Sequence, residues 1–222
     1  MPVIVFDLDD TLYEEITFVR SGFRAVAAYL HRRFGIHPEE SYAEMIEILD
    51  AEGRGRVFDR MLALHNRLSV QLTKECLAVY RSHEPAIALA ADAVKCLEQL
   101  AAFPIYIVTD GNKLVQRRKL QALGLLDDPR IRRCFITRRF GVRNEKPSPY
   151  CFLKICELER ANPEDVIYIG DNPNKDFVGI KPLGFRTVRI LRGAYAKLRM
   201  RETHEADRQI RDLAELKDII FE

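Results

Sequence analysis

The sequence lacks an excess of charge of either sign. It has 222 residues, and its 35 Lys and Arg residues are nearly balanced by 33 Asp and Glu residues, which leaves a net charge of +2 at pH 7. A chain this close to neutral gives no general reason to expect nucleic acid or a membrane surface as a partner. Because 47% of the residues are hydrophobic and 31% are charged, the composition also argues against disorder of the whole chain.

Cysteine pairs and long apolar runs are missing as well. The five cysteines form no CxxC pair and no metal-ligand spacing, and an odd number fits reduced thiols better than a disulfide framework. No segment approaches the roughly 20 apolar residues of a membrane span. The N-terminus shows no basic stretch followed by an apolar signal core. We therefore expect a soluble protein of the cytoplasm.

The sequence does contain short apolar segments that end in acids and alternate with helical patterns. The strand candidates are VIVF (3–6), IYIVTD (105–110), VIYIGD (166–171), FRTVRIL (185–191) and a short CFIT (134–137). The helical patterns lie at 92–101, 114–123, 149–159 and 174–183. This alternation predicts an α/β fold with a doubly wound, Rossmann-like parallel sheet. Ligands of such sheets bind beyond the carboxyl ends of the strands, where the acids are expected to gather.

One segment interrupts this alternation. Residues 16–89 contain helical patterns and no convincing strand. We predict a separate helical domain at 16–89, inserted into a domain made of 1–15 and 90–222, because so many consecutive helices need a core of their own. The alternative is that these helices cover one face of the sheet. A short strand followed by a helix is expected near the C-terminus, within 204–220.

The first strand runs directly into a cluster of carboxylates. Asp7 and Asp9 would share one side of an extended chain. Two carboxylates that close repel each other by about 4 kcal/mol at an effective dielectric constant of about 20, so either a proton or a cation has to separate them. Asp171 would lie at the same edge of the sheet, and several oxygen ligands suit a hard ion such as Mg²⁺.

Four segments resemble the signatures of the haloacid dehalogenase superfamily of phosphatases and phosphotransferases, in the order of that family. They are DLDDT (7–11), VTDGN (108–112), EKPSPYCF (145–152) and IGDNPNKD (169–176). The helical insertion lies where this family has its cap, so the resemblance implies that 16–89 is a helical cap domain and that 1–15 and 90–222 form the catalytic core. Ser148 departs from the pattern, because an Asp is common at that position.

The resemblance implies the catalytic roles. Asp7 would attack the phosphorus atom and form an aspartyl-phosphate, and Asp9 would act as general acid and then as general base. Lys146 would pair with Asp7 and the phosphoryl group. Family dehalogenases lack the second acid, so Asp9 favours a phosphate ester over a carbon–halogen bond as the bond that is broken.

The resemblance also implies the phosphate and metal sites. Thr109 would bind a phosphoryl oxygen, helped by backbone N–H groups near Gly111, and Asp110 is either a further site residue or a turn residue. Asp171 would bind Mg²⁺ together with Asp7 and the backbone carbonyl of Asp9. Asp176 would be an additional ligand or would support the ligands.

Three functions stay open at this point. The first is a Mg²⁺-dependent phosphatase that acts on a small phosphorylated metabolite, and the second is a phosphomutase or phosphotransferase with the same acids. The third is a regulatory module that binds phosphate without turnover. The basic run at 130–143 is either a solvated face or a source of one Arg for a second anionic group of the substrate. The sequence leaves the oligomeric state open.

Overall fold

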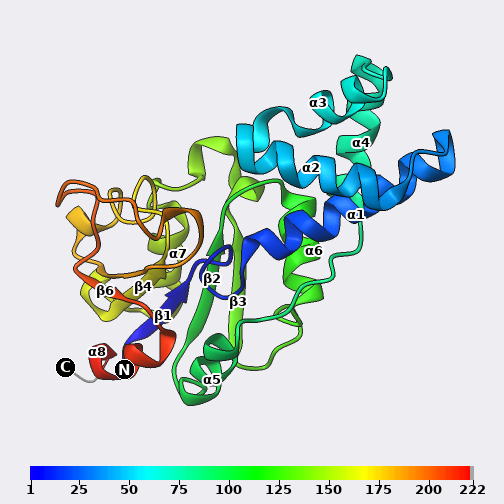
Figure 1. The fold of residues 1–222 in the computed structure, drawn as a ribbon. Coiled ribbons are helices and arrows are strands. Elements are labelled where there is room, and N and C mark those ends of the chain that lie inside the picture. The colour runs from blue at the N-terminus through cyan, green and yellow to red at the C-terminus, as the bar shows by residue number, and fades with distance from the viewer. Residues whose placement is uncertain (221–222) are drawn as a thin grey trace. The chain divides into compact units, whose positions relative to one another are not determined.

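The chain forms two compact units. The computed structural model describes residues 1–220, and Figure 1 shows its helices and strands. One unit consists of residues 1–15 and 87–222 and the other of residues 16–86. The second unit ends three residues before the cap boundary that was expected from the sequence.

The first unit is built on a six-stranded parallel sheet, as predicted. The strands are β1 (Val3–Phe6), β2 (Ile105–Thr109), β3 (Ile131–Ile136), β4 (Val166–Gly170), β5 (Arg186–Ile190) and β6 (Arg208–Ile210). Their order in the sheet is β3-β2-β1-β4-β5-β6, so the strand that carries Asp7 lies near the middle. The candidate CFIT strand is confirmed as the end of β3, which begins three residues earlier.

Helices connect the strands of this unit on both faces of the sheet. They are α5 (Ala91–Gln99), α6 (Lys113–Ala122) and α7 (Tyr150–Glu159), and the short α8 (Leu216–Ile220) follows the last strand. The chain moves outward from β1 to β3 and then outward in the opposite direction from β4 to β6. Because such crossovers are right-handed, α5 and α6 lie on one face of the sheet and α7 lies on the other.

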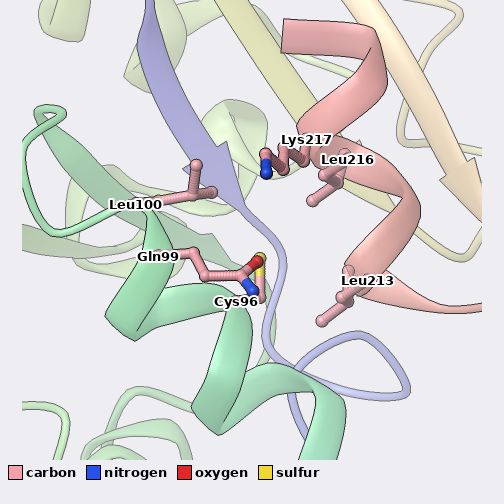
Figure 2. A pocket seen from close by; sticks show the side chains of 6 residues that line it. All are labelled: Cys96, Gln99, Leu100, Leu213, Leu216 and Lys217. Carbon is pink, nitrogen blue, oxygen red and sulfur yellow. The ribbon is translucent and has the colours of Figure 1, made fainter.

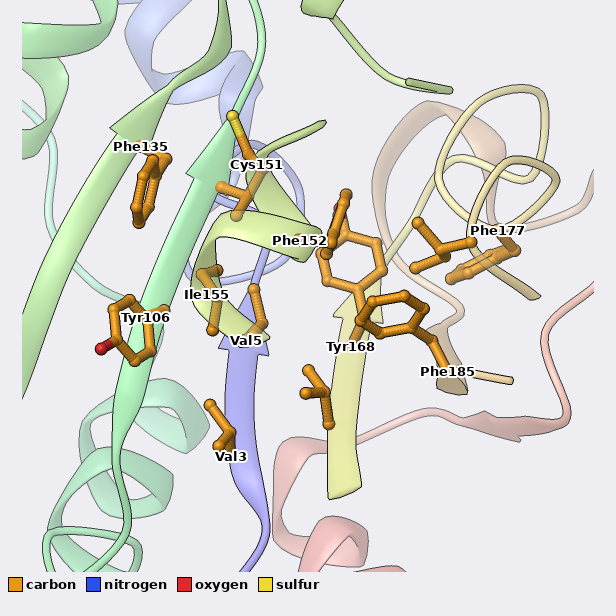
Figure 3. Close-up of a cluster of buried hydrophobic side chains, with 13 residues drawn as sticks. Val3, Val5, Tyr106, Phe135, Cys151, Phe152, Ile155, Tyr168, Phe177 and Phe185 are labelled. Carbon is orange, nitrogen blue, oxygen red and sulfur yellow. The ribbon is translucent and has the colours of Figure 1, made fainter. Parts of the chain in front are cut away.

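The face beneath α7 is covered by a buried apolar cluster (Figure 3). Every second residue of the central strands has its side chain on this face, for example Val5 and Tyr168. Phe152 and Ile155 of α7 pack into the same cluster. All five residues of β2 and of β4 are buried, as expected for strands that are covered on both sides. The cluster therefore fixes the strand ends from which the candidate site residues project.

The prediction of a helix at 174–183 is wrong. The segment forms turns and one short 3₁₀ helix, Lys181–Leu183. Gly179 and Pro182 both disfavour an α-helix. A Cβ at Gly179 would lie 1.7 Å from the carbonyl oxygen of Pro147. The backbone at Gly179 therefore packs directly against the third signature segment, at a distance that leaves no room for a side chain. The predicted strand and helix near the C-terminus are confirmed by β6 and α8.

The second unit is entirely helical in structure. Its helices are α1 (Glu15–Phe34, which begins one residue before the unit), α2 (Pro38–Glu52), α3 (Val57–Leu64) and α4 (Val70–Ser82). They share a buried apolar cluster that includes Phe23, Met45, Met61 and Cys76. Ser69 caps α4 by accepting a hydrogen bond from the N–H of Leu72 at 3.1 Å. Across residues 1–220, no helix is long and apolar enough to cross a membrane.

Candidate active site

Strand pairing brings Asp7 next to the fourth signature segment. Phe6 of β1 pairs with Ile169 of β4, and the N–H of Asp7 extends this pairing by donating to the carbonyl oxygen of Ile169 at 2.8 Å. Asp7 therefore leaves β1 beside Gly170 and Asp171, although the two segments are far apart in the sequence. The prediction that the acids meet at the carboxyl edge of the sheet is confirmed for Asp7 and Asp171, since both also belong to one cluster of carboxylates.

Lys146 completes this cluster. Its ammonium nitrogen lies 2.8 Å from Asp7 Oδ1 and 2.7 Å from Asp176 Oδ1. It also donates to the hydroxyl oxygen of Tyr168 at 2.8 Å, and that hydroxyl donates to Asp176 Oδ1 at 3.0 Å. An ammonium group has three protons to donate. The three oxygen atoms therefore fix the position of Lys146 at a side-chain exposure of 1%.

The carboxylates of Asp7, Asp171 and Asp176 fit a hard metal ion. Each offers one oxygen atom, and these atoms all lie within 4.8 Å of one another. Both oxygens of Asp176 already accept hydrogen bonds, because Oδ2 accepts from the N–H of Asn172 at 2.8 Å. Asp176 is thus well placed to hold Lys146 and the loop in position, while Asp7 and Asp171 are better placed to bind a cation.

Gly170 allows this arrangement. A Cβ at Gly170 would lie 2.6 Å from Asp176 Oδ2, which is closer than non-bonded atoms approach. The Gly of the fourth signature is therefore required by the position of the Asp176 carboxylate.

The cluster carries more negative than positive charge. Burial raises the pKa of Asp171 to about 9, and Asp7 and Asp176 add to that effect. Burial also raises the pKa of Asp7 to about 7, against the opposing effect of Lys146. Burial by itself would lower the pKa of Lys146, but Asp176 and Asp7 raise it, so Lys146 stays charged. A cation at this position would neutralise the excess carboxylate charge.

Asp9 lies in different surroundings, although it is only two residues from Asp7. Its Oδ1 accepts from Lys119 Nζ at 2.6 Å and from the hydroxyl of Tyr13, and its Oδ2 accepts from Gln116 Nε2 at 2.8 Å. Burial alone would raise the pKa of Asp9, but the charge of Lys119 and these hydrogen bonds lower it. The Asp9 side chain is not part of the carboxylate cluster found among residues 1–220, so the structure turns it toward α6.

The second signature places Thr109 and Asp110 in distinct positions. The Thr109 side chain is buried at the end of β2, and its Oγ1 accepts from Gln116 Nε2 at 2.6 Å. Asp110 Oδ1 accepts from the Thr137 hydroxyl at 2.7 Å and from the N–H of Lys146 at 3.1 Å. Since this carboxylate has no proton to donate while ionised, Asp110 serves to hold the loops, and only its backbone N–H is suited to a phosphate oxygen.

Two glycines shape the loops around the site. Gly111 has φ +119°, a conformation that residues with a Cβ rarely adopt. A Cβ at Gly193 would lie 2.1 Å from Asp10 Cγ. Asp10 accepts from the N–H of Glu15 at 2.8 Å, so its carboxylate holds the turn between β1 and α1.

Sequence reasoning missed Tyr13, Gln116, Lys119 and Tyr168. A signal for two of them exists on α6, where the buried stripe consists of Val115, Gln116, Lys119 and Leu120. A Gln and a Lys in the stripe that otherwise packs against the core require buried partners. Tyr168 gave no such signal, because a Tyr within an apolar strand resembles an ordinary core residue.

The basic run at 130–143 is partly neutralised by ion pairs. Arg138 forms two hydrogen bonds with Glu145, at 2.8 Å and 3.1 Å, and Arg130 pairs with Asp128 at 2.6 Å. Neither Arg is therefore presented as a free cation for a second anionic group of a substrate.

A pocket of about 230 Å³ lies between α5 and the C-terminal segment (Figure 2). Its lining includes Cys96 and Leu100 on one side and Leu213 and Leu216 on the other. Leu100 directly follows α5 and lies five residues before β2 begins, so the pocket is at the amino end of the strands. It is therefore remote from the acids at the carboxyl end.

The fold and the site together define a class of α/β hydrolases. This class has a Rossmann-like parallel sheet, a helical segment after the first strand, and acids with a buried Lys at the carboxyl edge of the sheet. The chain belongs to the haloacid dehalogenase-like hydrolase family, whose model matches residues 1–184. It is an enzyme, and within that family it is a hydrolase of the phosphatase kind.

Relatives with known names span nearly the whole chain. It is 30% identical to a glyceraldehyde 3-phosphate phosphatase of Methanocaldococcus jannaschii, over 98% of this chain and 96% of that protein. It is also 30% identical to a protein of the same name from Methanopyrus kandleri, over 99% and 97%. The crystal structure of a phosphatase of this family from Thermococcus onnurineus has a TM-score of 0.62 at 27% identity and covers 99% of this chain and 98% of that one.

Proposed function

We propose that the protein is a Mg²⁺-dependent phosphatase that hydrolyses a small phosphorylated metabolite through an aspartyl-phosphate intermediate. The observation that carries this proposal is the cluster in which Lys146 Nζ lies 2.8 Å from Asp7 Oδ1 while Asp171 and Asp176 lie beside it. The cluster combines a carboxylate nucleophile with a fixed cation and with oxygen ligands for a second cation.

In the first half-reaction, Asp7 attacks the phosphorus atom and the ester bond to the leaving oxygen breaks. Asp9 donates a proton to that oxygen, and Thr109 and the backbone N–H groups near Gly111 bind phosphoryl oxygens. In the second half-reaction, Asp9 removes a proton from water, which attacks the aspartyl-phosphate and releases phosphate and Asp7. Lys146 offsets the repulsion between the Asp7 carboxylate and the phosphate ester in both steps.

Mg²⁺ is the cofactor that we assign to this site. The proposed ligands are the carboxylates of Asp7 and Asp171 and the backbone carbonyl of Asp9, with Asp176 as an additional ligand or support. When bound, the ion would neutralise negative charge on the phosphoryl oxygens and on the carboxylates. The raised pKa values of Asp7 and Asp171 support a cation at this position.

Glyceraldehyde 3-phosphate is the first substrate to test, because the two relatives at 30% identity carry its name. The proposal also includes a location in the cytoplasm, and it includes neither nucleic acid nor a membrane as a partner. None of the five cysteines, all of which lie in the described part of the chain, forms a disulfide, which is consistent with a reducing compartment.

The test is release of inorganic phosphate from glyceraldehyde 3-phosphate, p-nitrophenyl phosphate and a panel of phosphorylated sugars, nucleotides and small acids. We expect turnover with MgCl₂ and its loss with EDTA. Asp7→Asn should reduce turnover by at least about 10⁴-fold, whereas the exposed Asp127→Asn should leave it unchanged. Turnover that survives EDTA would contradict the metal assignment, and an isomerised substrate without free phosphate would instead support a phosphomutase.

A further inference from the structure

The proposed reaction steps do not involve the polar side chains on the buried stripe of α6. Lys119 has a side-chain exposure of 4%, and its ammonium group lies 2.6 Å from Asp9 Oδ1. Gln116 is 2% exposed. A buried Lys is held charged at a considerable desolvation cost, so nearby carboxylates are needed to offset it. Asp9 is the nearer one, and Glu15 Oε1 lies 3.6 Å from the same ammonium group.

The orientation of the Gln116 amide follows from its two partners. Its nitrogen donates to Asp9 Oδ2 at 2.8 Å and to Thr109 Oγ1 at 2.6 Å. An ionised carboxylate only accepts hydrogen bonds, so the NH₂ group and not the amide oxygen must face Asp9. Both amide protons are then used, one on each partner. A single side chain thus joins the proposed general acid to the proposed phosphate-binding hydroxyl.

This contact also determines what Thr109 can do. Because Oγ1 accepts a hydrogen bond from Gln116, the hydroxyl proton of Thr109 remains for donation to another acceptor. A phosphoryl oxygen is such an acceptor. Tyr13 adds a third donor to Asp9, and burial and Asp9 both raise the pKa of its phenol, so it keeps its proton.

We propose that Gln116 and Lys119 are positioning residues that fix the Asp9 carboxyl relative to Thr109. The Asp9 carboxyl then lies within hydrogen-bond distance of the leaving oxygen when Thr109 binds the phosphoryl group. This inference rests on the proposed phosphatase function. Both residues contact the Asp9 carboxyl and act on the proposed reaction through it. A misplaced general acid loses most of its effect, because proton transfer requires hydrogen-bond distance to the leaving oxygen.

The leaving group distinguishes positioning from a merely structural role. The alkoxide that leaves from glyceraldehyde 3-phosphate is a strong base and needs a proton from Asp9. The p-nitrophenolate that leaves from p-nitrophenyl phosphate is a weak base and departs without one. For both esters, kcat/KM reports the steps up to cleavage of the ester bond, so the ratio of the two values isolates the contribution of the general acid.

The experiment measures that ratio for Gln116→Met and Lys119→Met, with Gln121→Met and Lys95→Met as controls. The controls repeat the same substitutions at exposed positions on α6 and α5. We expect kcat/KM for glyceraldehyde 3-phosphate to fall about tenfold more than that for p-nitrophenyl phosphate in both test variants. In the controls we expect neither value to change by more than about twofold. Gln116→Met keeps the ion pair of Lys119 with Asp9, so it remains informative if Lys119→Met fails to fold.

An equal loss for the two esters, or no loss, would overturn the inference and leave Gln116 and Lys119 with a role in stability alone. The wild-type enzyme separates this failure from failure of the proposed function. If it hydrolyses neither ester with Mg²⁺ present, the proposed function falls, and the inference that rests on it falls too.

Discussion

Asp7 and Asp9 are separated by one residue, yet their surroundings are opposite in charge. Asp7 shares a buried space with Asp171 and Asp176 and has Lys146 as its cation. Asp9 accepts hydrogen bonds from Lys119, Gln116 and Tyr13. The pKa of Asp7 is raised to about 7, whereas that of Asp9 is lowered.

This difference in surroundings matches the two roles that we propose for these residues. The Asp7 side has too little positive charge until a cation binds, so it is the side suited to Mg²⁺ and to a phosphoryl group. The Asp9 side is already neutralised by Lys119. Two titratable groups whose surroundings drive their pKa values apart are typical of acid and base assignments in enzymes. In the proposed mechanism, a bound phosphate ester would bring negative charge and would raise the pKa of Asp9 toward the protonated form that the first half-reaction requires.

The largest expected effect comes from exchanging each Asp for Asn. Asp9→Asn should slow turnover by about 10²- to 10⁴-fold and let the phosphoenzyme accumulate, because water lacks its base. Asp7→Asn should form no phosphoenzyme, since the nucleophile is gone. Acid quench with ³²P-labelled substrate, or mass spectrometry of the intact protein, measures both. Phosphoenzyme in Asp7→Asn would refute the assignment of the nucleophile.

The same two variants should change stability in opposite directions. In the metal-free protein at pH 8, Asp7→Asn should raise the melting temperature, because it removes one of three crowded carboxylates. Asp9→Asn should lower it, because buried Lys119 loses its ion pair at 2.6 Å and keeps only the longer one with Glu15 at 3.6 Å. Thermal unfolding followed by circular dichroism measures this, and two shifts of the same sign would contradict the comparison.

The sequence predicts the Asp7 side of the site better than the Asp9 side for a physical reason. Asp7, Thr109 and Asp171 end or follow buried parallel strands, and the carboxyl ends of such strands meet at one edge whatever the remaining sequence. Asp9 lies beyond the strand, where its direction depends on contacts with a helix more than 100 residues later. Such contacts follow from tertiary packing, which local patterns do not encode.

The fold shows the same limit at 174–183. Its apolar residues Phe177 and Ile180 are buried as expected, but turns rather than a helix bury them. The deciding contact is the approach of Gly179 to Pro147, which joins two signature segments. No spacing within one segment predicts a contact of that kind.

A smaller effect is expected from removing the hydroxyl of Tyr168. Tyr168→Phe takes one of three acceptors from Lys146 and a donor from Asp176. We expect kcat/KM for p-nitrophenyl phosphate to fall about tenfold, which is typical of a buried hydrogen bond to a charged group. Steady-state kinetics at saturating MgCl₂ measures the change.

Tyr106→Phe is the matched control for that variant. Tyr106 lies in the same apolar cluster (Figure 3), and its hydroxyl donates to Glu159 of α7 instead of to the site. We expect its activity to stay within about twofold of the wild type, as for most substitutions that leave a site intact. Equal losses in the two variants would show that Tyr168 supports the fold rather than Lys146.

The smallest effect concerns pH. In the metal-free protein the pKa of Asp171 is about 9 and that of Asp7 about 7, against an ordinary value of 3.8. A carboxyl whose pKa is raised by folding stabilises the folded state below its unfolded pKa, and this stabilisation is lost as pH rises through the folded pKa. The metal-free protein should therefore lose stability between about pH 4 and pH 9. Asp9 and Asp110 act in the opposite sense, but their lowered pKa values confine their effect to the acid side of this window.

Mg²⁺ should reverse that loss, because it binds the ionised carboxylates and competes with protons for them. The increase in melting temperature on addition of MgCl₂ should therefore grow from pH 6 to pH 9, by a few degrees in total. Asp171→Asn should reduce this increase at every pH, whereas the exposed Asp127→Asn should not. A Mg²⁺ effect that is independent of pH would mean that the ion binds away from the raised carboxyls, and the contrast between Asp7 and Asp9 would then have a cause other than a metal site.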